Sequence, residues 1–191
     1  MIIIKVERDV FMLYTLTFYS FSNLIRFNAD SQFNMPVGNQ YFNNQCKGII
    51  SQWCNLIKEK NIEYLNKNCF DILDNYDFKE NDFIYVDPPY TNTEAIYNEK
   101  MAFGGWEIED DLRLFKKLDE LNAKGIKWGL SNTFESRGKI NEHLVEWANK
   151  NKYTIIHLDL KYYSLGKGNA ENDEVYICNY PIKRMKSVEL W

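Results

Sequence analysis

The stretch that decides the fold is Phe83-Ile84-Tyr85-Val86, followed at once by Asp87-Pro88-Pro89-Tyr90. The first four residues are apolar or aromatic, which predicts a short buried β-strand. Proline donates no backbone N–H and holds φ fixed, so the two prolines end this strand. The carboxylate of Asp87 is therefore expected at the carboxyl end of a strand, the edge at which open α/β sheets bind their ligands. A simple turn is the alternative, because Asp-Pro commonly opens turns.

Patterns of helices and strands alternate after this stretch. Leucine and phenylalanine recur at three- and four-residue spacing over residues 109–123, which predicts an amphipathic helix that ends before Gly125. Strands are expected at residues 126–130, 153–160 and 174–180, and a helix at residues 140–149. The last two strands are joined only by the loop at residues 162–173, so we expect them to form an antiparallel hairpin within an open α/β sheet.

The part of the chain before this alternation has a different character. Residues 10–23 predict one buried apolar helix, and the acidic residues before it and polar residues within it argue against a signal peptide or a membrane span. Residues 26–43 are rich in asparagine and carry Pro36 and Gly38, which indicates a structured loop or a small hairpin. A second helix is expected at residues 48–59 and a short strand at residues 62–65.

The composition excludes several classes of protein. The chain has 191 residues, of which 45% are apolar, enough for the core of one ordinary domain. Its net charge of −4 argues mildly against a free-standing nucleic-acid binder, which usually carries a basic surface. The four cysteines lack the Cys-x-x-Cys spacing of zinc or redox sites and only two histidines occur, so we expect no metal site. Scattered single thiols suit the reducing cytoplasm.

The tetrapeptide Asp87-Pro88-Pro89-Tyr90 has the parts needed to hold an aromatic amine. The exocyclic amine of a purine is a poor nucleophile because its lone pair is conjugated into the ring. The Asp87 carboxylate can accept one of its N–H bonds, and the Pro88 carbonyl the other, in a direction that the prolines fix. Tyr90 offers a flat face on which an extruded base can stack. We therefore expect Asp87, Pro88, Pro89 and Tyr90 to be catalytic, without a covalent intermediate.

These residues, with several others in the same order, resemble the DNA adenine methylase (Dam) family. The family's target-recognition region resembles Asn23-Leu24-Ile25-Arg26-Phe27-Asn28 and Phe33-Asn34-Met35-Pro36-Val37-Gly38. Its later motifs resemble Tyr97 and Phe103, Leu130-Ser131-Asn132 and the closing Glu174-Val175-Tyr176-Ile177-Cys178-Asn179-Tyr180. Together these matches cover most of residues 10–181.

The resemblance implies a fold, a reaction and a set of site residues. It implies a Rossmann-like, S-adenosylmethionine-dependent methyltransferase sheet that transfers a methyl group to the N6 amine of a flipped adenine in double-stranded DNA. Asp87 would lie between cofactor and base. Phe70 would lie against the adenine of the cofactor, with a core aromatic as the alternative. The residues implied to organise or contact DNA are Asn23, Arg26, Asn34, Ser131 and Asn132.

One part of the family's pattern is missing. The family's Phe-x-Gly-x-Gly loop precedes its recognition region, whereas the only Gly-x-Gly here is Gly166-Lys167-Gly168. We therefore expect an incomplete sheet in a truncated or split enzyme, whose binding of S-adenosylmethionine needs an N-terminal partner subunit or self-association. The expected division is a target-recognition segment at residues 1–60, a catalytic part at residues 61–182 and a basic tail at residues 183–191.

Two other functions stay open. A catalytically inactive remnant or DNA-binding module would keep the recognition region without affinity for the cofactor. A methyltransferase acting on an amine of RNA or protein would share the Asp-Pro-Pro-aromatic pattern but not the resemblance over residues 26–38.

Overall fold

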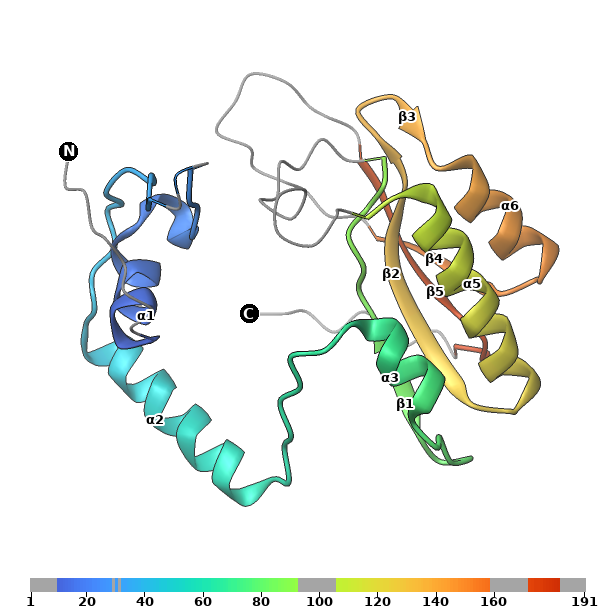
Figure 1. Ribbon diagram of the computed structural model, residues 1–191, viewed down its shortest axis with the longest axis horizontal. Helices are drawn as coiled ribbons and strands as arrows, with labels where there is room; N and C mark the ends of the chain where they lie inside the picture. Colours follow the sequence, from blue (N-terminus) through green and yellow to red (C-terminus); the bar gives the residue numbers. More distant parts are fainter. Residues whose placement is uncertain (1–9, 29, 31, 93–105, 159–171, 183–191) are drawn as a thin grey trace. The chain divides into compact units, whose positions relative to one another are not determined.

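A computed structural model describes residues 10–28, 30, 32–92, 106–158 and 172–182 (Figure 1). The chain divides into two compact units, Met1–Asn66 and Lys67–Trp191. The functional division expected at residues 60 and 61 is a different kind of boundary and stays a prediction.

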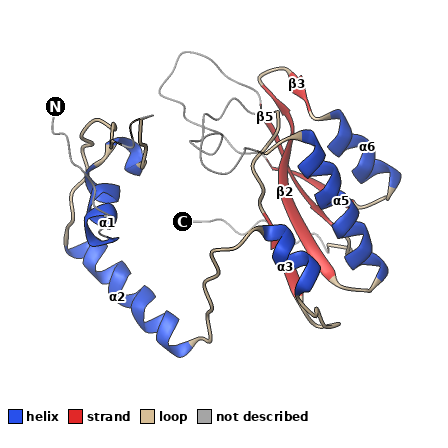
Figure 2. Ribbon diagram, in the orientation of Figure 1, coloured by secondary structure: helices blue, strands red, loops and turns tan. Residues whose placement is uncertain are grey.

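The second unit is built on a mixed sheet with strand order β1-β2-β5-β4 (Figure 2). Its strands are β1 (Phe83–Val86), β2 (Lys127–Ser136), β4 (Thr154–Leu158) and β5 (Asn172–Cys178). The β1 strand runs parallel to β2, whereas β5 is antiparallel to both β2 and β4. The expected α/β fold with an antiparallel C-terminal hairpin is therefore confirmed, with Ile155 opposite Ile177 inside that hairpin.

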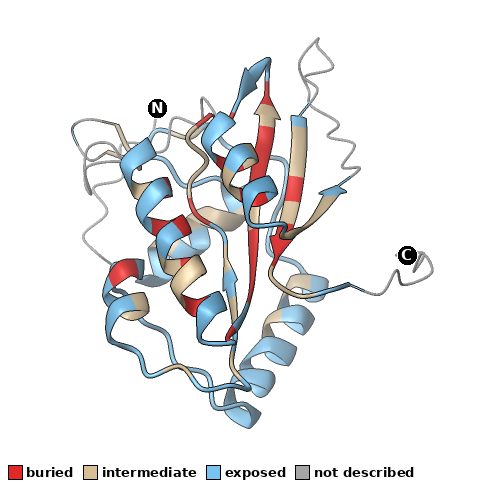
Figure 3. Cartoon of the chain, turned by 90° about the vertical axis from the view of Figure 1, so that its right-hand side faces the viewer, coloured by how far each residue is buried: buried red, intermediate tan, exposed pale blue. Residues whose placement is uncertain are grey.

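Two helices, α5 (Ile108–Ala123) and α6 (Glu142–Lys150), supply the core that packs on β2. The helix α5 begins with a capping box between Glu107 and Asp110. Figure 3 shows the buried residues along β2 and within α5. The indole of Trp128, fully buried, donates to the Leu118 carbonyl of α5 at 2.9 Å, which fixes the helix against the strand. The buried apolar side chains of α5, α6, β2 and β5 in this core are Leu114, Phe115, Leu118, Leu121, Trp128, Leu130, Phe134, Leu144, Ala148, Val175 and Ile177.

Several boundaries differ from those expected. The strand expected at residues 126–130 continues to Ser136, and β3 (Lys139–Ile140) folds back on it through a turn in which Arg137 and Gly138 both have positive φ. A two-residue turn of this kind matches the twist of the two strands that it joins. The turn and β3 were not predicted from the sequence. The helix α3 (Cys69–Asn75) was also not expected; Asn68 caps it by accepting from the Phe70 N–H.

The first unit contains α1 (Val10–Tyr19), the 3-10 helix η1 (Phe21–Asn23) and α2 (Asn44–Glu59). The helix predicted at residues 10–23 is present as α1, but the prediction that it is buried is wrong. No residue of α1 is buried, and Phe11 is 83% exposed. The strand expected at residues 62–65 is also absent, since these residues form irregular backbone without strand pairing.

The asparagine-rich loop of the first unit is a small structured hairpin, as expected. Phe27 bridges to Phe33, and Ser20 bridges to Val37. Gly38 lies so close to this second bridge that a Cβ atom there would come within 2.5 Å of the Ser20 carbonyl oxygen. Glycine is therefore required by the close approach of two backbone segments.

Some expected features lie outside the described residues. They are Tyr97, Phe103, the Gly166-Lys167-Gly168 loop and the tail at residues 183–191. Within the part of the chain that the structure describes, no helix has the length and apolar character needed to cross a membrane.

Candidate active site

The tetrapeptide lies immediately after β1, at the carboxyl edge of the sheet. The Asp87 side chain is exposed, Pro88 is buried, and Pro89 and Tyr90 are partly buried. The Tyr90 hydroxyl donates to Asp87 Oδ1 at 3.1 Å. One carboxylate oxygen is thus already engaged by an O–H donor, which shows that this position can accept a hydrogen bond from a neighbouring group.

The phenol of Tyr90 is held in its neutral, donating form. Burial of the side chain, together with the adjacent Asp87 carboxylate, raises the pKa of Tyr90 well above its usual value. A neutral phenol keeps its proton for Asp87 and leaves the ring as an apolar surface. The pair therefore combines an acceptor for an amine with an aromatic face in one turn of backbone.

Two hydrogen bonds between hydroxyl groups join side chains of the second unit. Tyr85 of β1 and Ser131 of β2 are hydrogen-bonded at 2.7 Å between their hydroxyl oxygens. The hydroxyls of Tyr176 and Tyr180 make a second such bond at 2.7 Å. The Tyr176 ring lies over Gly129, where a Cβ atom would overlap its hydroxyl. Glycine at this point of β2 therefore makes room for the tyrosine.

The two residues of the Ser-Asn motif have different environments. Ser131 is partly exposed and bonds Tyr85, as described, whereas Asn132 is buried with 1% of its surface exposed. Asn132 Oδ1 accepts from the Thr133 N–H at 2.8 Å, and among the described residues its Nδ2 has no hydrogen-bond partner. Both lie in the middle of β2 rather than at the strand end that the sequence indicated. Contact of either residue with DNA stays a prediction.

A polar network behind the tetrapeptide was missed by sequence reasoning. Thr91 Oγ1 donates to Asp111 Oδ2 at 2.8 Å, and Asn141 Nδ2 donates to the same hydroxyl at 3.4 Å. Asn92, also buried, donates to the carbonyls of Thr133 and Lys139 at 3.4 and 3.1 Å. Single polar residues dispersed over the sequence give no motif, so only the fold could bring them together.

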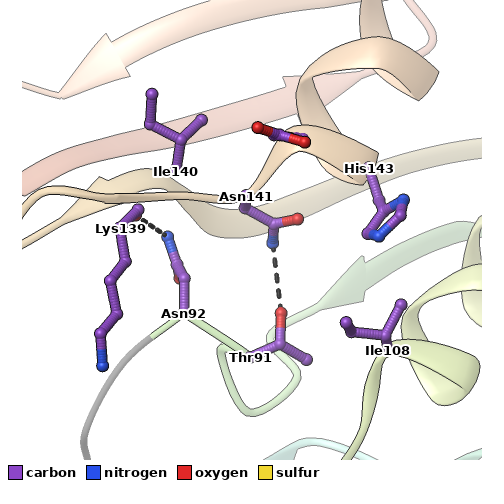
Figure 4. A pocket seen from close by; sticks show the side chains of 8 residues that line it. Thr91, Asn92, Ile108, Lys139, Ile140, Asn141 and His143 are labelled. Carbon is purple, nitrogen blue, oxygen red and sulfur yellow. Dashed lines mark hydrogen bonds between the residues drawn. The ribbon is translucent and has the colours of Figure 1, made fainter.

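A small hollow adjoins this network, with a volume of about 270 Å³ (Figure 4). Thr91 and Asn92 line it from the loop after the tetrapeptide, and Asn141 and His143 from the start of α6. Figure 4 shows the Asn92 amide directed toward Lys139 and the Asn141 amide directed toward Thr91. The walls of the hollow are thus held together by the same hydrogen bonds that fix the loop.

Phe70 lies in the core of the second unit, with 3% of its surface exposed. Its ring stacks on Trp106 with 5.8 Å between centroids, and the Arg113 guanidinium carbon lies 4.0 Å from the ring centroid. This is the core-aromatic alternative. Its contact with S-adenosylmethionine stays a prediction.

The recognition residues of the first unit organise one another. Arg26 Nε donates to Asn34 Oδ1 at 2.9 Å, and the Asn34 N–H donates to the Arg26 carbonyl at 3.1 Å. Asn23 donates to the Thr17 carbonyl at 2.8 Å and has a positive φ. Residues eight apart in the sequence are thus joined across the hairpin. Their contact with DNA stays a prediction.

The residues with metal-ligating side chains do not gather. No group of three or more histidine, cysteine, aspartate or glutamate side chains with the geometry of a metal site occurs in the described ranges. The cysteines Cys46, Cys54, Cys69 and Cys178 are all free thiols.

The sequence of the chain matches a known protein family and several known proteins. Residues 2–164 match the model of the D12 class N6 adenine-specific DNA methyltransferases. The chain is 35% identical over 150 residues to "Modification methylase LlaI" of Lactococcus lactis subsp. lactis, an alignment that covers 78% of this chain and 24% of the relative. It is 34% identical over 173 residues to "Type II methyltransferase M.FokI" of Planomicrobium okeanokoites, covering 88% of this chain and 26% of the relative.

A third relative leads to the same conclusion. "Modification methylase StsI" of Streptococcus sanguinis is 31% identical over 176 residues, which cover 90% of this chain and 27% of the relative. The chain thus spans about a quarter of the length of these relatives. With the tetrapeptide at the carboxyl end of β1 and a family match over residues 2–164, the chain belongs to the D12 class N6 adenine-specific DNA methyltransferase family.

Proposed function

We propose that the chain transfers a methyl group from S-adenosylmethionine to the N6 amine of a flipped adenine in double-stranded DNA. The observation that carries this proposal is the exposed Asp87 carboxylate at the carboxyl end of β1, with the Tyr90 hydroxyl 3.1 Å from it. Membership in the D12 class family implies S-adenosylmethionine as the methyl donor, a sulfonium that supplies an electrophilic methyl group.

The residues of the tetrapeptide divide the work of holding the amine. Asp87 accepts one N–H of the adenine amine, and the Pro88 carbonyl accepts the other. Two acceptors on the two N–H bonds favour the tetrahedral amine, whose lone pair is no longer conjugated into the ring. After methyl transfer the extra proton leaves the nitrogen through Asp87.

Tyr90 has a separate function as the surface on which the extruded base lies. Extrusion costs a few kcal/mol of stacking and pairing energy, which stacking on a protein aromatic ring partly offsets. Stacking requires the ring but not the hydroxyl. Tyr90→Phe should therefore keep most of the activity, whereas Tyr90→Ala should lose it mainly through weaker binding of the base.

The cofactor site is only partly formed by the described residues. Asp87 is exposed where a cofactor can reach it, whereas Phe70 is buried in the core. The strand β1 pairs with β2 alone among the described strands, and Phe83 and Tyr85 on it are 54% and 57% exposed. An open strand edge is a template for further pairing. We propose that a further strand, from a partner subunit or a second copy of the chain, pairs here and completes the site.

Radioactive methyl transfer tests the reaction itself. The chain is incubated with S-adenosylmethionine labelled in its methyl group and with long unmethylated DNA of mixed sequence, because the recognised site is unknown. We expect label in DNA as N6-methyladenine, identified by mass spectrometry of the nucleosides. Asp87→Asn should lower kcat about 100- to 1,000-fold, the usual effect of removing one preorganised polar contact. Asp82→Asn, at the opposite end of β1, is the matched control with the same charge change.

Calorimetry distinguishes the remaining possibilities. Affinity of the isolated chain for S-adenosylmethionine would contradict the need for a further strand. Absence of affinity, followed by its appearance on dimerisation or on addition of a partner, would support it. Salt-dependent binding to duplex DNA without any methyl transfer or cofactor affinity would favour the non-catalytic DNA-binding module instead.

A further inference from the structure

A buried carboxylate lies directly behind the tetrapeptide. Asp111 belongs to the first turn of α5, and only 1% of its surface is exposed. Its Oδ2 accepts from Thr91 Oγ1 at 2.8 Å, and its Oδ1 accepts from the Trp106 indole N–H at 2.9 Å. Both carboxylate oxygens are therefore used, each by a donor of a different segment.

The two donors have a particular relation in the sequence. Thr91 follows the tetrapeptide immediately, and Trp106 lies two residues before the start of α5. Between them lie residues 92–105. One carboxylate thus holds the chain at the point where it leaves the tetrapeptide and at the point where it enters α5.

The same threonine is held from a second side. Asn141 Nδ2 donates to Thr91 Oγ1 at 3.4 Å, while Asn141 Oδ1 accepts from the Leu144 N–H at 3.2 Å and so caps α6. The next residue, Asn92, bonds the Thr133 and Lys139 carbonyls of the β2–β3 hairpin. Within the described residues, side-chain hydrogen bonds therefore tie the backbone after Tyr90 to α5, α6 and the hairpin.

Burial of a carboxylate carries a desolvation cost that an apolar side chain of similar size does not have. Taking the charge out of water raises the pKa of Asp111, and the hydrogen bonds from Trp106 and Thr91 act against this rise. An apolar side chain would occupy the position without the desolvation cost. What the carboxylate adds is two directed bonds, one of them only four residues from Asp87. The carboxylate therefore differs from an apolar side chain by fixing the orientation of Thr91 and Trp106, rather than by adding stability.

We infer that Asp111 is a positioning residue of the methyl-transfer reaction: by holding Thr91 and Trp106 it fixes the orientation of Asp87, Pro88 and Tyr90 toward the base. The inference rests on the proposed function for its effect on catalysis. Asp111 acts on the tetrapeptide through its hydrogen bonds with Thr91 and Trp106. A shift of the tetrapeptide of about 1 Å is enough to reduce turnover about 100-fold, because reactive geometry is lost.

The test uses the full chain and four variants. Asp111→Asn keeps the shape but replaces one acceptor oxygen by an amide N–H₂, so one donor loses its partner. Thr91→Val removes the hydroxyl, and Thr91→Ser restores it. Glu109→Gln, on the exposed side of the same helical turn, removes one negative charge without touching the network and is the matched control.

Three measurements are made on each protein. Hydrogen exchange followed by mass spectrometry reports opening of the amides of Asp87, Tyr90, Thr91 and Asn92. Methyl-transfer kinetics with labelled S-adenosylmethionine and DNA separate kcat from KM. Thermal unfolding shows which variants are folded; if Asp111→Asn is not, the Thr91→Val and Thr91→Ser pair decides.

The inference predicts faster exchange of these amides in Asp111→Asn and Thr91→Val, with recovery in Thr91→Ser and no change in Glu109→Gln. It further predicts a decrease in kcat of about 10- to 100-fold with a change in KM for DNA of less than about 3-fold. Unchanged exchange in Asp111→Asn and Thr91→Val overturns the inference. Absence of methyl transfer in the wild type contradicts the proposed function, while the exchange data still decide whether the network holds the tetrapeptide.

Discussion

Gly129 is the position where one added methyl group tests the packing below the tetrapeptide most sharply. In β2 it pairs with Tyr85 of β1 on one side and with Cys178 of β5 on the other. A Cβ atom there would overlap the Tyr176 hydroxyl and come within 2.5 and 2.8 Å of two ring carbons. Gly129→Ala therefore forces the Tyr176 ring to move.

The size of the effect follows from three contributions. Inserting a methyl group into a packed site costs about 1–3 kcal/mol. Displacing the ring breaks the 2.7 Å bond between the hydroxyls of Tyr176 and Tyr180, worth about 1 kcal/mol net. Alanine offsets part of this, because glycine in a strand costs about 0.5–1 kcal/mol in backbone entropy. We expect Gly129→Ala to lower the free energy of unfolding by about 1–3 kcal/mol.

Urea unfolding followed by far-ultraviolet circular dichroism measures this change, and a double-mutant cycle identifies its cause. Tyr176→Ala removes all three atoms that the new Cβ atom would meet. In that background Gly129→Ala should be neutral or slightly stabilising. Equal costs of Gly129→Ala in the two backgrounds, or no cost in the wild type, would refute the reasoning.

Three further changes are expected in the second unit. Burial raises the pKa of Asp111, so its contribution to stability is present below the ordinary aspartate pKa of about 4 and is lost as the pH rises through its higher folded value. The wild type should therefore gain stability relative to Asp111→Asn as the pH is lowered from 7. A difference in unfolding free energy that does not change with pH contradicts this. Asp74 has the opposite sign, because the Lys117 hydrogen bond lowers its pKa and its contribution is lost as the pH falls below about 4. Asp74→Asn should flatten the acid side of the stability profile measured by urea titration, and an unchanged profile argues against the pair. Trp128→Phe removes the indole hydrogen bond to the Leu118 carbonyl and leaves a space in the core. It should cost about 2–4 kcal/mol in the same assay, whereas a loss below about 1 kcal/mol is inconsistent with this packing.

The sequence predicted the parts of the second unit that depend on local pattern. The short apolar run ending in Asp-Pro-Pro placed Asp87 at a strand end, and helical spacing of leucines located α5 to within one residue. The closing motif at residues 174–180 was recognised in the sequence, but the structural role of its asparagine was not. Asn179 accepts from the Trp128 N–H and donates to the Ile126 carbonyl, so it ties the end of β5 to the start of β2. Asn179 belongs to a motif shared with the family, and its hydrogen bonds stabilise the fold.

The sequence could not show what depends on tertiary packing. Extension of β2 to Ser136 uses mainly polar and charged residues, with Phe134 the apolar exception, and these residues are held by pairing with β5. The apolar residues of α1 suggested burial, although burial is a property of neighbours rather than of composition. The Asp111 network joins α5, α6 and the tetrapeptide through residues separated by up to 50 positions.

The central claim is that Asp87 directs methyl transfer to the adenine amine in DNA. Its most direct test is the amount of N6-methyladenine, measured by mass spectrometry, in DNA from a bacterial host that lacks adenine methyltransferases and expresses the chain. We expect N6-methyladenine above background with the wild type and with Tyr90→Phe, and background levels with Asp87→Ala expressed to the same amount. N6-methyladenine formed equally well by Asp87→Ala, or methylation found only on RNA or protein, would contradict it.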